Sequence, residues 1–279
     1  MMEIINKKIL AEALDVKITQ LEVLSPDISK KTKPGQFVVV MVNEHGERIP
    51  LTIAYNDNKG ITLIFQEVGL TTKLLGKLNI GDSLYALTGP LGRPTEIKKY
   101  GRVILAGGGV GIAEIFPVAK ALKEAGNHIT TILGARTKKL LILENELKEI
   151  SNEVYVVTDD GSYGKKGFTT DILQNLLTNN SDLQTINLIY TVGPIPMMKK
   201  IASLTKPFNI KTIVSLNALM VDGTGMCGGC RVSIGGETKF SCIDGPEFNG
   251  HLVDWDELEK RNKIYLNKEK HICNLYNLS

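Results

Sequence analysis

The sequence of 279 residues is long enough for two domains of ordinary size. Hydrophobic residues make up 43% of it and charged residues 23%, which predicts a packed globular protein and excludes a disordered chain. The net charge of +3 is small, and Lys and Arg are scattered among Asp and Glu, so we expect no nucleic-acid partner.

The sequence also predicts no contact with a membrane. The most apolar stretch, residues 103–113, is short, rich in glycine and followed by Glu114, whereas a transmembrane helix needs about 20 apolar residues. The first residues contain an early acid, Glu3, and no long apolar run, which predicts the absence of a signal peptide. We therefore expect a cytoplasmic protein.

The first part of the chain, up to about residue 95, has the pattern of short strands and turns. Strands are predicted at 37–42, 51–55, 61–65 and 83–88, with the last ending at Gly89-Pro90. One predicted helix, residues 71–78, interrupts them. Several short strands at this spacing are typical of a small barrel or sandwich.

The pattern changes after Gly92-Arg93-Pro94, because apolar strands now alternate with amphipathic helices. Strands are predicted at 103–106, 129–135, 154–158 and 187–192, and helices at 114–125 and 140–150. This alternation predicts a parallel sheet that helices cover on both faces. From about residue 216 the chain is rich in turns around the cysteines, and a short helix is predicted near 255–263.

Three of the four cysteines lie close together in the sequence. Cys227, Cys230 and Cys242 follow Asp222 with the spacing Asp-x4-Cys-x2-Cys-x11-Cys, and Cys273 lies far downstream. Plant-type 2Fe–2S proteins have the spacing Cys-x4-Cys-x2-Cys with a distant fourth cysteine. The pattern therefore predicts a 2Fe–2S cluster with a carboxylate in the first ligand position, and it leaves Cys273 as a plain thiol.

Glycines in residues 223–229 fit a loop that wraps closely around a cluster, because glycine adopts the positive φ angles that such a loop needs. A structural zinc ion on the same side chains is the alternative. An Asp before a Gly is also typical of a turn, so a ligand role and a turn role both stay open for Asp222.

A second glycine-rich segment, residues 105–113, lies between a predicted strand and a predicted helix. Such a turn holds a nucleotide diphosphate against backbone N–H groups and the positive end of a helix. The segment is not the G-x-G-x-x-G fingerprint, because Ile112 stands where the third Gly is needed. A turn that only packs is the alternative.

Three further loops, at 134–138, 158–164 and 191–198, also follow predicted strands. Ligands of open parallel sheets bind beyond the carboxyl ends of the strands, so these loops and the glycine turn predict one nucleotide site. Its candidate residues are Gly107, Gly108, Gly109, Gly111, Ile112, Arg136, Asp159, Asp160, Gly161, Gly193, Pro194 and Met197. For Arg136, contact with a ribose or phosphate and a role as a solvated charge both stay open.

The order of these features resembles the ferredoxin–NADP reductase superfamily: a β-rich domain, then a sheet with Gly-Gly-Gly-Val-Gly-Ile-Ala at 107–113 and Gly-Pro-Ile-Pro-Met-Met at 193–198. The cysteine-containing tail narrows the resemblance to electron-transfer subunits related to that of dihydroorotate dehydrogenase. Residues 220–228 and 244–248 are most similar to the small subunits of NADH-dependent reduced ferredoxin:NADP oxidoreductases, also described as sulfide dehydrogenase subunits. The resemblance covers nearly the whole chain.

The resemblance implies a β-barrel FAD-binding domain (1–98), an α/β parallel-sheet NAD(P)-binding domain (99–215) and a small C-terminal 2Fe–2S cluster subdomain with a tail (216–279). The implied cofactors are FAD, a 2Fe–2S cluster and NAD(H) or NADP(H). The implied partner is a large subunit with its own flavin and 4Fe–4S clusters, forming a heterodimer through which ferredoxin reacts.

The resemblance also implies a flavin site on the first domain. Its residues are Arg48, Pro50, Leu51 and Thr52 near the isoalloxazine, and Gly69, Thr71 and Thr72 at the pyrophosphate. The superfamily places an Arg three residues before the Ser or Thr, but here Ile49 stands there, and a one-residue shift in a strand reverses the side chain's face. The contact of Arg48 with FAD therefore stays open. Thr71 replaces a usual Gly, and Asp222 replaces a Cys of the dihydroorotate dehydrogenase subunits.

We therefore expect an oxidoreductase subunit that oxidises NAD(P)H through FAD and a 2Fe–2S cluster, and that serves as the small subunit of an electron-bifurcating enzyme. No catalytic side chain is assigned. A dihydroorotate dehydrogenase electron-transfer subunit and a sulfide dehydrogenase subunit are the alternatives. A zinc-stabilised nucleotide sensor without flavin is the non-enzymatic alternative, and the turn at 69–72 argues against it.

Overall fold

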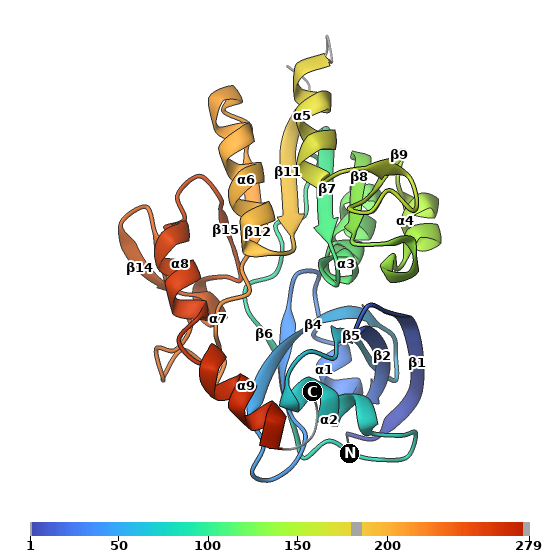
Figure 1. Ribbon diagram of the computed structural model, residues 1–279, viewed down its shortest axis with the longest axis vertical. Coiled ribbons are helices and arrows are strands. Elements are labelled where there is room, and N and C mark those ends of the chain that lie inside the picture. Colours follow the sequence, from blue (N-terminus) through green and yellow to red (C-terminus); the bar gives the residue numbers. More distant parts are fainter. Residues whose placement is uncertain (1, 180–185, 276–279) are drawn as a thin grey trace. The chain divides into compact units, whose positions relative to one another are not determined.

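The chain folds as two units that each contain one large sheet (Figure 1). The computed structural model describes residues 2–179 and 186–275. The barrel unit contains residues 1–94, 217–246 and 254–279, and the sheet unit contains residues 95–216 and 247–253. The backbone therefore passes between the units four times.

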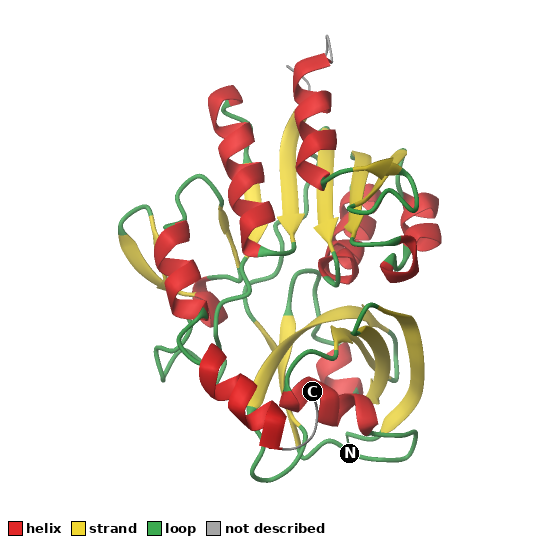
Figure 2. Ribbon diagram, viewed as in Figure 1, coloured by secondary structure: helices red, strands yellow, loops and turns green. Residues whose placement is uncertain are grey.

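The barrel unit contains a six-stranded antiparallel sheet in the order β1-β2-β5-β4-β3-β6, whose strands curve strongly (Figure 2). The strands are β1 (Ile4–Ala13), β2 (Val16–Leu24), β3 (Phe37–Met41), β4 (Arg48–Asn56), β5 (Gly60–Gln66) and β6 (Ala86–Leu91). The segment before β6 pairs with the start of β1: Ile4 N–H donates to Asp82 O (2.8 Å) and Leu84 N–H donates to Met2 O (3.0 Å). These bonds close the sheet on itself. Two helices, α1 (Pro26–Ser29) and α2 (Leu70–Lys77), complete this part.

Alternating apolar side chains fill the barrel. Val38 and Val40 of β3 pack with Leu63 and Phe65 of β5 in one buried cluster. Because successive side chains of a strand point to opposite faces, the neighbouring Val39 lies on the outer face of β3. The alternation of buried and outward side chains along β3 therefore decides which residues lie on the outer face of the barrel.

The predicted end of the last barrel strand is wrong. β6 continues through Gly89-Pro90 to Leu91, and its register with β3 shifts where these two residues stand. Proline lacks an N–H group and cannot donate a hydrogen bond to a neighbouring strand. It is tolerated in β6 because this strand stands last in the sheet order and has a register shift at this place.

The sheet unit contains seven strands in the order β10-β9-β8-β7-β11-β12-β15, all parallel except the antiparallel β15. The strands are β7 (Arg102–Gly108), β8 (His128–Ala135), β9 (Glu153–Thr158), β10 (Lys165–Lys166), β11 (Ile186–Val192), β12 (Thr212–Ser215) and β15 (Glu247–Asn249). The helices are α3 (Gly111–Glu124), η1 (Lys138–Leu140), α4 (Glu144–Ile150), α5 (Thr169–Asn179), α6 (Ile195–Thr205) and η3 (Lys206–Phe208). Helices α3 and α4 pack together, and α5 and α6 pack against the sheet through a shared apolar core.

The helices differ from the prediction at several ends. Helix α3 begins at Gly111 rather than at residue 114. The predicted helix at 140–150 is shorter, because Leu143 has a left-handed conformation (φ 53°) and α4 starts only after it. Helix α6 was not predicted, since Pro194 and Pro196 suggest a loop although proline is well tolerated in a first helical turn.

The cysteine-containing segment belongs to the barrel unit. It forms the hairpin β13 (Arg231–Ile234) and β14 (Glu237–Phe240) and the short helix α7 (Ser241–Asp244). Two helices follow, α8 (Trp255–Asn262), in agreement with the prediction, and α9 (Leu266–Leu275), which packs on α2. The side chain of Cys273 lies outside the described residues.

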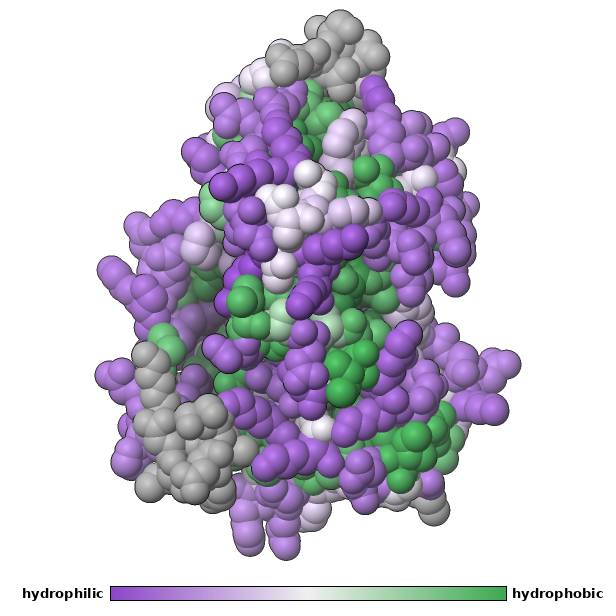
Figure 3. All heavy atoms as spheres, turned by 45° about the vertical axis from the view of Figure 1, so that its right-hand side comes forward, coloured by the Kyte–Doolittle hydropathy of each residue, from purple (hydrophilic) through white to green (hydrophobic). Residues whose placement is uncertain are grey.

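Figure 3 shows hydrophilic side chains over most of the face drawn, with smaller apolar areas between them. Among the described helices, none combines the length and the apolar character needed to cross a bilayer.

A buried carboxylate, that of Glu247, forms hydrogen bonds that connect two segments at which the chain enters the sheet unit. Thr95 follows the first passage of the backbone and Glu247 follows the third. The Glu247 carboxylate accepts hydrogen bonds from the Thr95 hydroxyl and from Tyr190 Oη (2.8 Å). Burial raises the pKa of Glu247 to about 7, although both hydrogen bonds act to lower it.

We predict that Glu247 makes stability fall as the pH rises from about 4.5 to 7. The folded chain keeps this proton up to a pH of about 7, whereas an unfolded chain loses it near 4.5, so the folded state binds more protons between these values. The loss is up to about 3 kcal/mol and is complete above the folded pKa. Denaturant unfolding of Glu247→Gln from pH 4 to 8 should show this slope reduced. The matched control Glu146→Gln, at an exposed position of α4, should keep the wild-type slope, and equal slopes in both variants would refute the assignment.

Candidate functional site

Strand β4 presents the predicted flavin residues on two faces. Ile49 and Leu51 pack against the barrel core, so Arg48, Pro50 and Thr52 lie on the opposite face. Arg48 and Thr52 share that face because they are four residues apart. Because Arg48 stands four residues before Thr52 and not three, its side chain lies on the same face of β4 as Thr52, while Leu51 points inward.

The predicted pyrophosphate turn is the N-terminus of α2. Thr72 Oγ1 accepts hydrogen bonds from the N–H groups of Val68 and Gly69, both at 3.0 Å, and Thr71 Oγ1 donates to Glu47 Oε2 (3.0 Å). These two hydroxyls therefore stabilise the turn itself. A Cβ atom added at Gly69 would meet no atom within 4 Å, so space is open above the start of the helix. Phosphate oxygens fit such a helix N-terminus.

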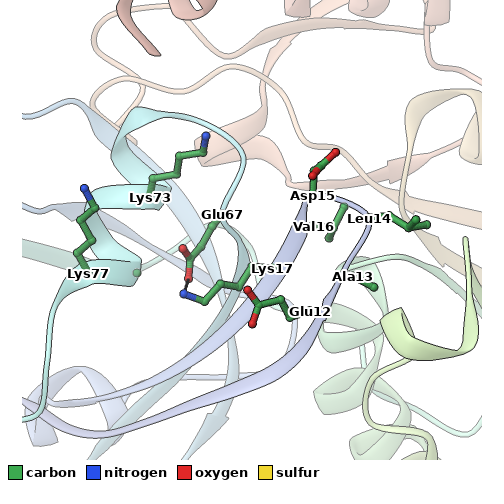
Figure 4. A pocket seen from close by; sticks show the side chains of 10 residues that line it. Glu12, Ala13, Leu14, Asp15, Val16, Lys17, Glu67, Lys73 and Lys77 are labelled. Carbon is green, nitrogen blue, oxygen red and sulfur yellow. Dashed lines mark ion pairs between the residues drawn. The ribbon is translucent and has the colours of Figure 1, made fainter. Parts of the chain in front are cut away.

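A pocket of about 640 Å³ adjoins this turn (Figure 4). The tip of the β1–β2 hairpin and α2 line it. Three lysines (Lys17, Lys73 and Lys77) and three carboxylates (Glu12, Asp15 and Glu67) contribute charged groups of both signs. Lys17 Nζ lies 3.3 Å from Oε1 of Glu67, the residue that precedes the turn. No sequence motif predicts this pocket, because the hairpin tip carries neither a glycine nor a recognisable pattern.

The cysteine loop packs on the outer face of the barrel. A Cβ atom added at Gly223 would lie 2.7 Å from Val39 Cγ2 and 2.9 Å from Leu91 Cδ1, and Gly223 has a φ of +74°. Only glycine allows both the close approach and this conformation. Val39 pairs with Pro50 in the sheet. The loop therefore lies beside the face of β4 that carries the predicted flavin residues.

The four predicted cluster ligands lie in this loop and in α7. The Sγ atoms of Cys230 and Cys242 are 3.1 Å apart and buried, whereas Cys227 is exposed. The Asp222 carboxylate accepts hydrogen bonds from the N–H groups of Thr224 (3.0 Å) and Cys227 (2.9 Å). Within the described residues, no three of these ligating side chains converge at ion-binding distance.

The donor set fits an iron–sulfur cluster. Burial and the adjacent Cys230 raise the pKa of the Cys242 thiol to about 12, so a thiolate there needs a compensating positive charge, which iron ions supply. Backbone N–H groups already point at two sulfurs: Gly229 donates to Cys227 Sγ (3.3 Å) and Cys242 donates to Cys230 Sγ (3.4 Å). The Thr224 N–H group is the first cause that lowers the pKa of Asp222, which keeps this carboxylate ionised.

Two of the predicted nucleotide loops contact each other directly. A Cβ atom added at Gly108 would lie 2.7 Å from Met197 Sδ and 3.1 Å from Pro194 Cδ, and one added at Gly111 would lie 2.5 Å from the carbonyl oxygen of Val192. The glycines therefore allow the ends of β7 and β11 to approach closely. Side chains at these positions would separate the two loops.

The other predicted nucleotide residues lie along the same edge of the sheet. Gly109 N–H donates to Gly134 O (2.9 Å), and Asp160 N–H donates to Arg136 O (3.2 Å). These hydrogen bonds connect the loop after β7 to the end of β8, and the loop after β9 to the loop after β8. Arg136, Asp159, Asp160 and Gly161 are exposed there. The side chain of Ile112 is buried and packs beside the end of β7, where a Cβ atom added at Gly107 would lie 3.2 Å from Ile112 Cγ1.

Comparisons with known proteins cover both of these segments. Residues 217–254 match the iron–sulfur cluster binding domain of dihydroorotate dehydrogenase B, and residues 105–203 match the oxidoreductase NAD-binding domain. A Thermotoga maritima protein named dihydroorotate dehydrogenase B (NAD(+)), electron transfer subunit homolog, is 49% identical over 96% of this chain and 93% of its own length.

Solved structures are similar as well. A chain in the structure of NADH-dependent reduced ferredoxin-NADP oxidoreductase, described in the context of flavin-based electron bifurcation, is 47% identical with a TM-score of 0.92. The match covers 100% of this chain and 98% of that one. Ferredoxin-NADP+ reductase from Plasmodium falciparum, at 18% identity and a TM-score of 0.57 over 73% of this chain and 88% of its own, shares the fold.

These findings confirm the predicted resemblance, the fold class and the electron-transfer role of an oxidoreductase. They also support the predicted cofactor set of FAD, a 2Fe–2S cluster and a nicotinamide nucleotide, and a partner subunit, since the relatives are named as subunits. The chain belongs to the family of dihydroorotate dehydrogenase B electron transfer subunits and their homologues.

Proposed function

We propose that this chain is the NADH-oxidising small subunit of an electron-bifurcating NADH-dependent reduced ferredoxin:NADP oxidoreductase. The likeness to that enzyme's chain over the full length and the carboxylate at position 222 support this proposal. When bound, the flavin takes a hydride and gives up single electrons, and the cluster carries these electrons one at a time. In functional terms, residues 1–98 would hold FAD, 99–215 the nicotinamide nucleotide and 216–279 the cluster.

The observation that carries the proposal is the contact of Gly223 with the outer face of β3. It brings the ligand loop next to β4, and hydrogen-bonded strands are only about 4.8 Å apart. The residues that would hold the flavin and those that would hold the cluster thus belong to one unit. Electron transfer between two centres requires such proximity, which a separate cluster domain on a flexible linker would not provide.

The chain's own residues would bind and orient the flavin. Thr52 and Arg48 would face the ring system from β4, and the N–H groups at the start of α2 would receive the pyrophosphate. Lys73 follows this turn and lines the adjoining pocket, so its ammonium group would offset phosphate charge. The open space above Gly69 would admit the phosphate oxygens.

The nicotinamide nucleotide would bind at the carboxyl edge of the parallel sheet. The glycines of the first turn would let its diphosphate approach the backbone and the N-terminus of α3. Asp159, Asp160 and Arg136 are exposed at neighbouring strand ends and would contact its ribose groups. We propose no side chain as a proton donor or acceptor, because hydride transfer between nicotinamide and flavin needs only their alignment.

A large partner subunit with its own flavin and 4Fe–4S clusters would cover the cluster loop. Large apolar side chains are exposed around it: Met226 at 89%, Val221 at 51% and Ile243 at 45%. Exposed apolar side chains gathered at a functional site are typical of a protein interface. Ferredoxin would react through this heterodimer, in the cytoplasm.

The second candidate is the electron transfer subunit of a dihydroorotate dehydrogenase, and the names of the relatives and the matched cluster domain favour it. The carboxylate at position 222 argues against it, since that family pattern has a cysteine there. A sulfide dehydrogenase subunit is a third candidate. The identity of the co-purified partner separates these three.

Purification without oxygen, with iron and FAD supplied, tests the proposal. We expect a coloured protein with flavin and 2Fe–2S absorption that NADH bleaches, and a co-purifying partner with 4Fe–4S clusters. An FMN-containing dihydroorotate dehydrogenase as partner would establish the second candidate instead. Colourless protein with stoichiometric zinc would overturn the flavin and iron–sulfur assignment altogether.

Replacement of Asp222 tests its place among the ligands. Asp222→Cys should keep a 2Fe–2S cluster and shift its reduction potential, because a thiolate replaces a hard carboxylate donor. Asp222→Asn should lower the iron content, since a neutral amide is a weaker ligand, although its oxygen can still accept a hydrogen bond within the loop. Protein-film voltammetry and iron analysis give the two readouts. An unchanged potential in Asp222→Cys would show that Asp222 does not bind iron and only stabilises the turn through its hydrogen bonds.

Replacement of Gly108 tests the nucleotide site. Gly108→Ala should weaken NADH binding about tenfold, because a Cβ atom pushes on Met197 and overpacking costs about 1–3 kcal/mol. Rapid-mixing measurements of flavin reduction at varied NADH concentration give the affinity. The double variant Gly108→Ala, Met197→Ala removes the nearest obstacle and should recover much of the loss, with unchanged FAD content. Equal affinities for the single and double variants would argue against this contact.

A further inference from the structure

The hydroxyl of Ser241 is buried without a hydrogen-bond partner. Ser241 is fully inaccessible to solvent, and among the described residues its Oγ atom makes no hydrogen bond. A buried polar group without a partner costs about 1–3 kcal/mol, and such groups in folded proteins almost always have one. The Ser241 hydroxyl therefore needs an acceptor, which a bound cofactor could supply.

Ser241 is fixed directly against two cluster ligands. It precedes Cys242 in α7, and its own N–H group donates to the carbonyl oxygen of Cys230 (3.0 Å). The next N–H group, that of Cys242, donates to Cys230 Sγ (3.4 Å). The backbone that carries the hydroxyl is thus held beside the two closest sulfur atoms of the site.

The acceptors nearest in sequence bond other donors and not the Ser241 hydroxyl. The carboxylate of Asp244, on the same short helix, accepts from the N–H group of Phe240 (2.9 Å) and from Arg93 (3.2 Å). The carbonyl of Cys230 accepts from the Ser241 N–H group. Sulfur is the acceptor that the proposed function adds to this buried space, since each cluster sulfur and ligand thiolate carries negative charge.

We propose that Ser241 Oγ–H donates a hydrogen bond to a sulfur of the bound cluster or of its cysteine ligands, and that this bond raises the cluster's reduction potential. The inference rests on the proposed 2Fe–2S site. The reduced cluster carries one more negative charge than the oxidised cluster, so a donor stabilises the reduced form more strongly. Ser241 is a positioning and tuning residue and does not ligate iron.

The test is an EPR-monitored redox titration of the holoprotein and its variants. Ser241→Ala removes the hydroxyl and little volume, so it should keep full iron and sulfide content. We expect its potential to be lower, corresponding to a roughly tenfold weaker reduction equilibrium, which is about 59 mV for a one-electron couple. Ser241→Cys keeps a weak donor and should give an intermediate potential. The control Ser233→Ala, on β13 in the same segment, should match the wild type.

A second readout separates this bond from a merely structural role. Resonance Raman bands of the Fe–S stretches should shift in D₂O in the wild type, and the shift should be smaller in Ser241→Ala, because one exchangeable donor to sulfur is gone. A Ser241→Ala cluster with wild-type potential and isotope shift would overturn the inference and leave the proposed function intact. If Ser241→Ala cannot retain iron, a wild-type potential in Ser241→Cys overturns it. Wild-type protein without a 2Fe–2S signal would overturn both proposals.

Discussion

The close approach of Gly223 to Val39 and Leu91 is the contact on which the proposed electron path depends. Local sequence would allow the cysteine loop to form a separate cluster domain after the parallel sheet. The chain instead returns to the barrel, and a glycine with positive φ lets the loop lie flat on the outer face of β3. A side chain at this position would need to displace Val39 and Leu91, so the contact fixes the ligand loop beside β4.

Local patterns predicted the elements that local residues determine. The parallel strands β7, β8, β9 and β11, their glycine turns and the cysteine spacing are predictable because each depends on a short run of residues, whereas the short strands β10 and β12 carry no such pattern. The β1–β2 hairpin was missed, since Leu14 and Asp15 form its tip with positive φ angles that usually require Asn or Gly. The unit to which residues 217–246 belong depends on long-range packing, which no local pattern encodes.

The face on which Arg48 lies follows from the sequence once β4 is known to be a regular strand. The four-residue distance to Thr52 already implied a common face, provided that β4 is regular between them. The structure supplies that regularity: the pairs of Arg48 with Met41 and of Thr52 with Phe37 belong to one unbroken register. Comparison with the superfamily's spacing drew attention to the missing Arg instead. Burial of Ile112, by contrast, could not be inferred from a glycine motif, because it depends on the sheet beneath α3.

The return of the chain through β15 limits how this protein can be dissected. The strand pairs antiparallel with β12 and forms one border of the nucleotide-binding sheet, although it follows the cysteine segment in sequence. Truncation at residue 216, intended to produce an isolated nicotinamide-binding fragment, would strip this border strand and expose the hydrogen-bonding groups of β12. Such a fragment would present an open sheet margin prone to self-association. A circularly permuted or re-linked design that retains 247–253 is the better route to a monomeric fragment.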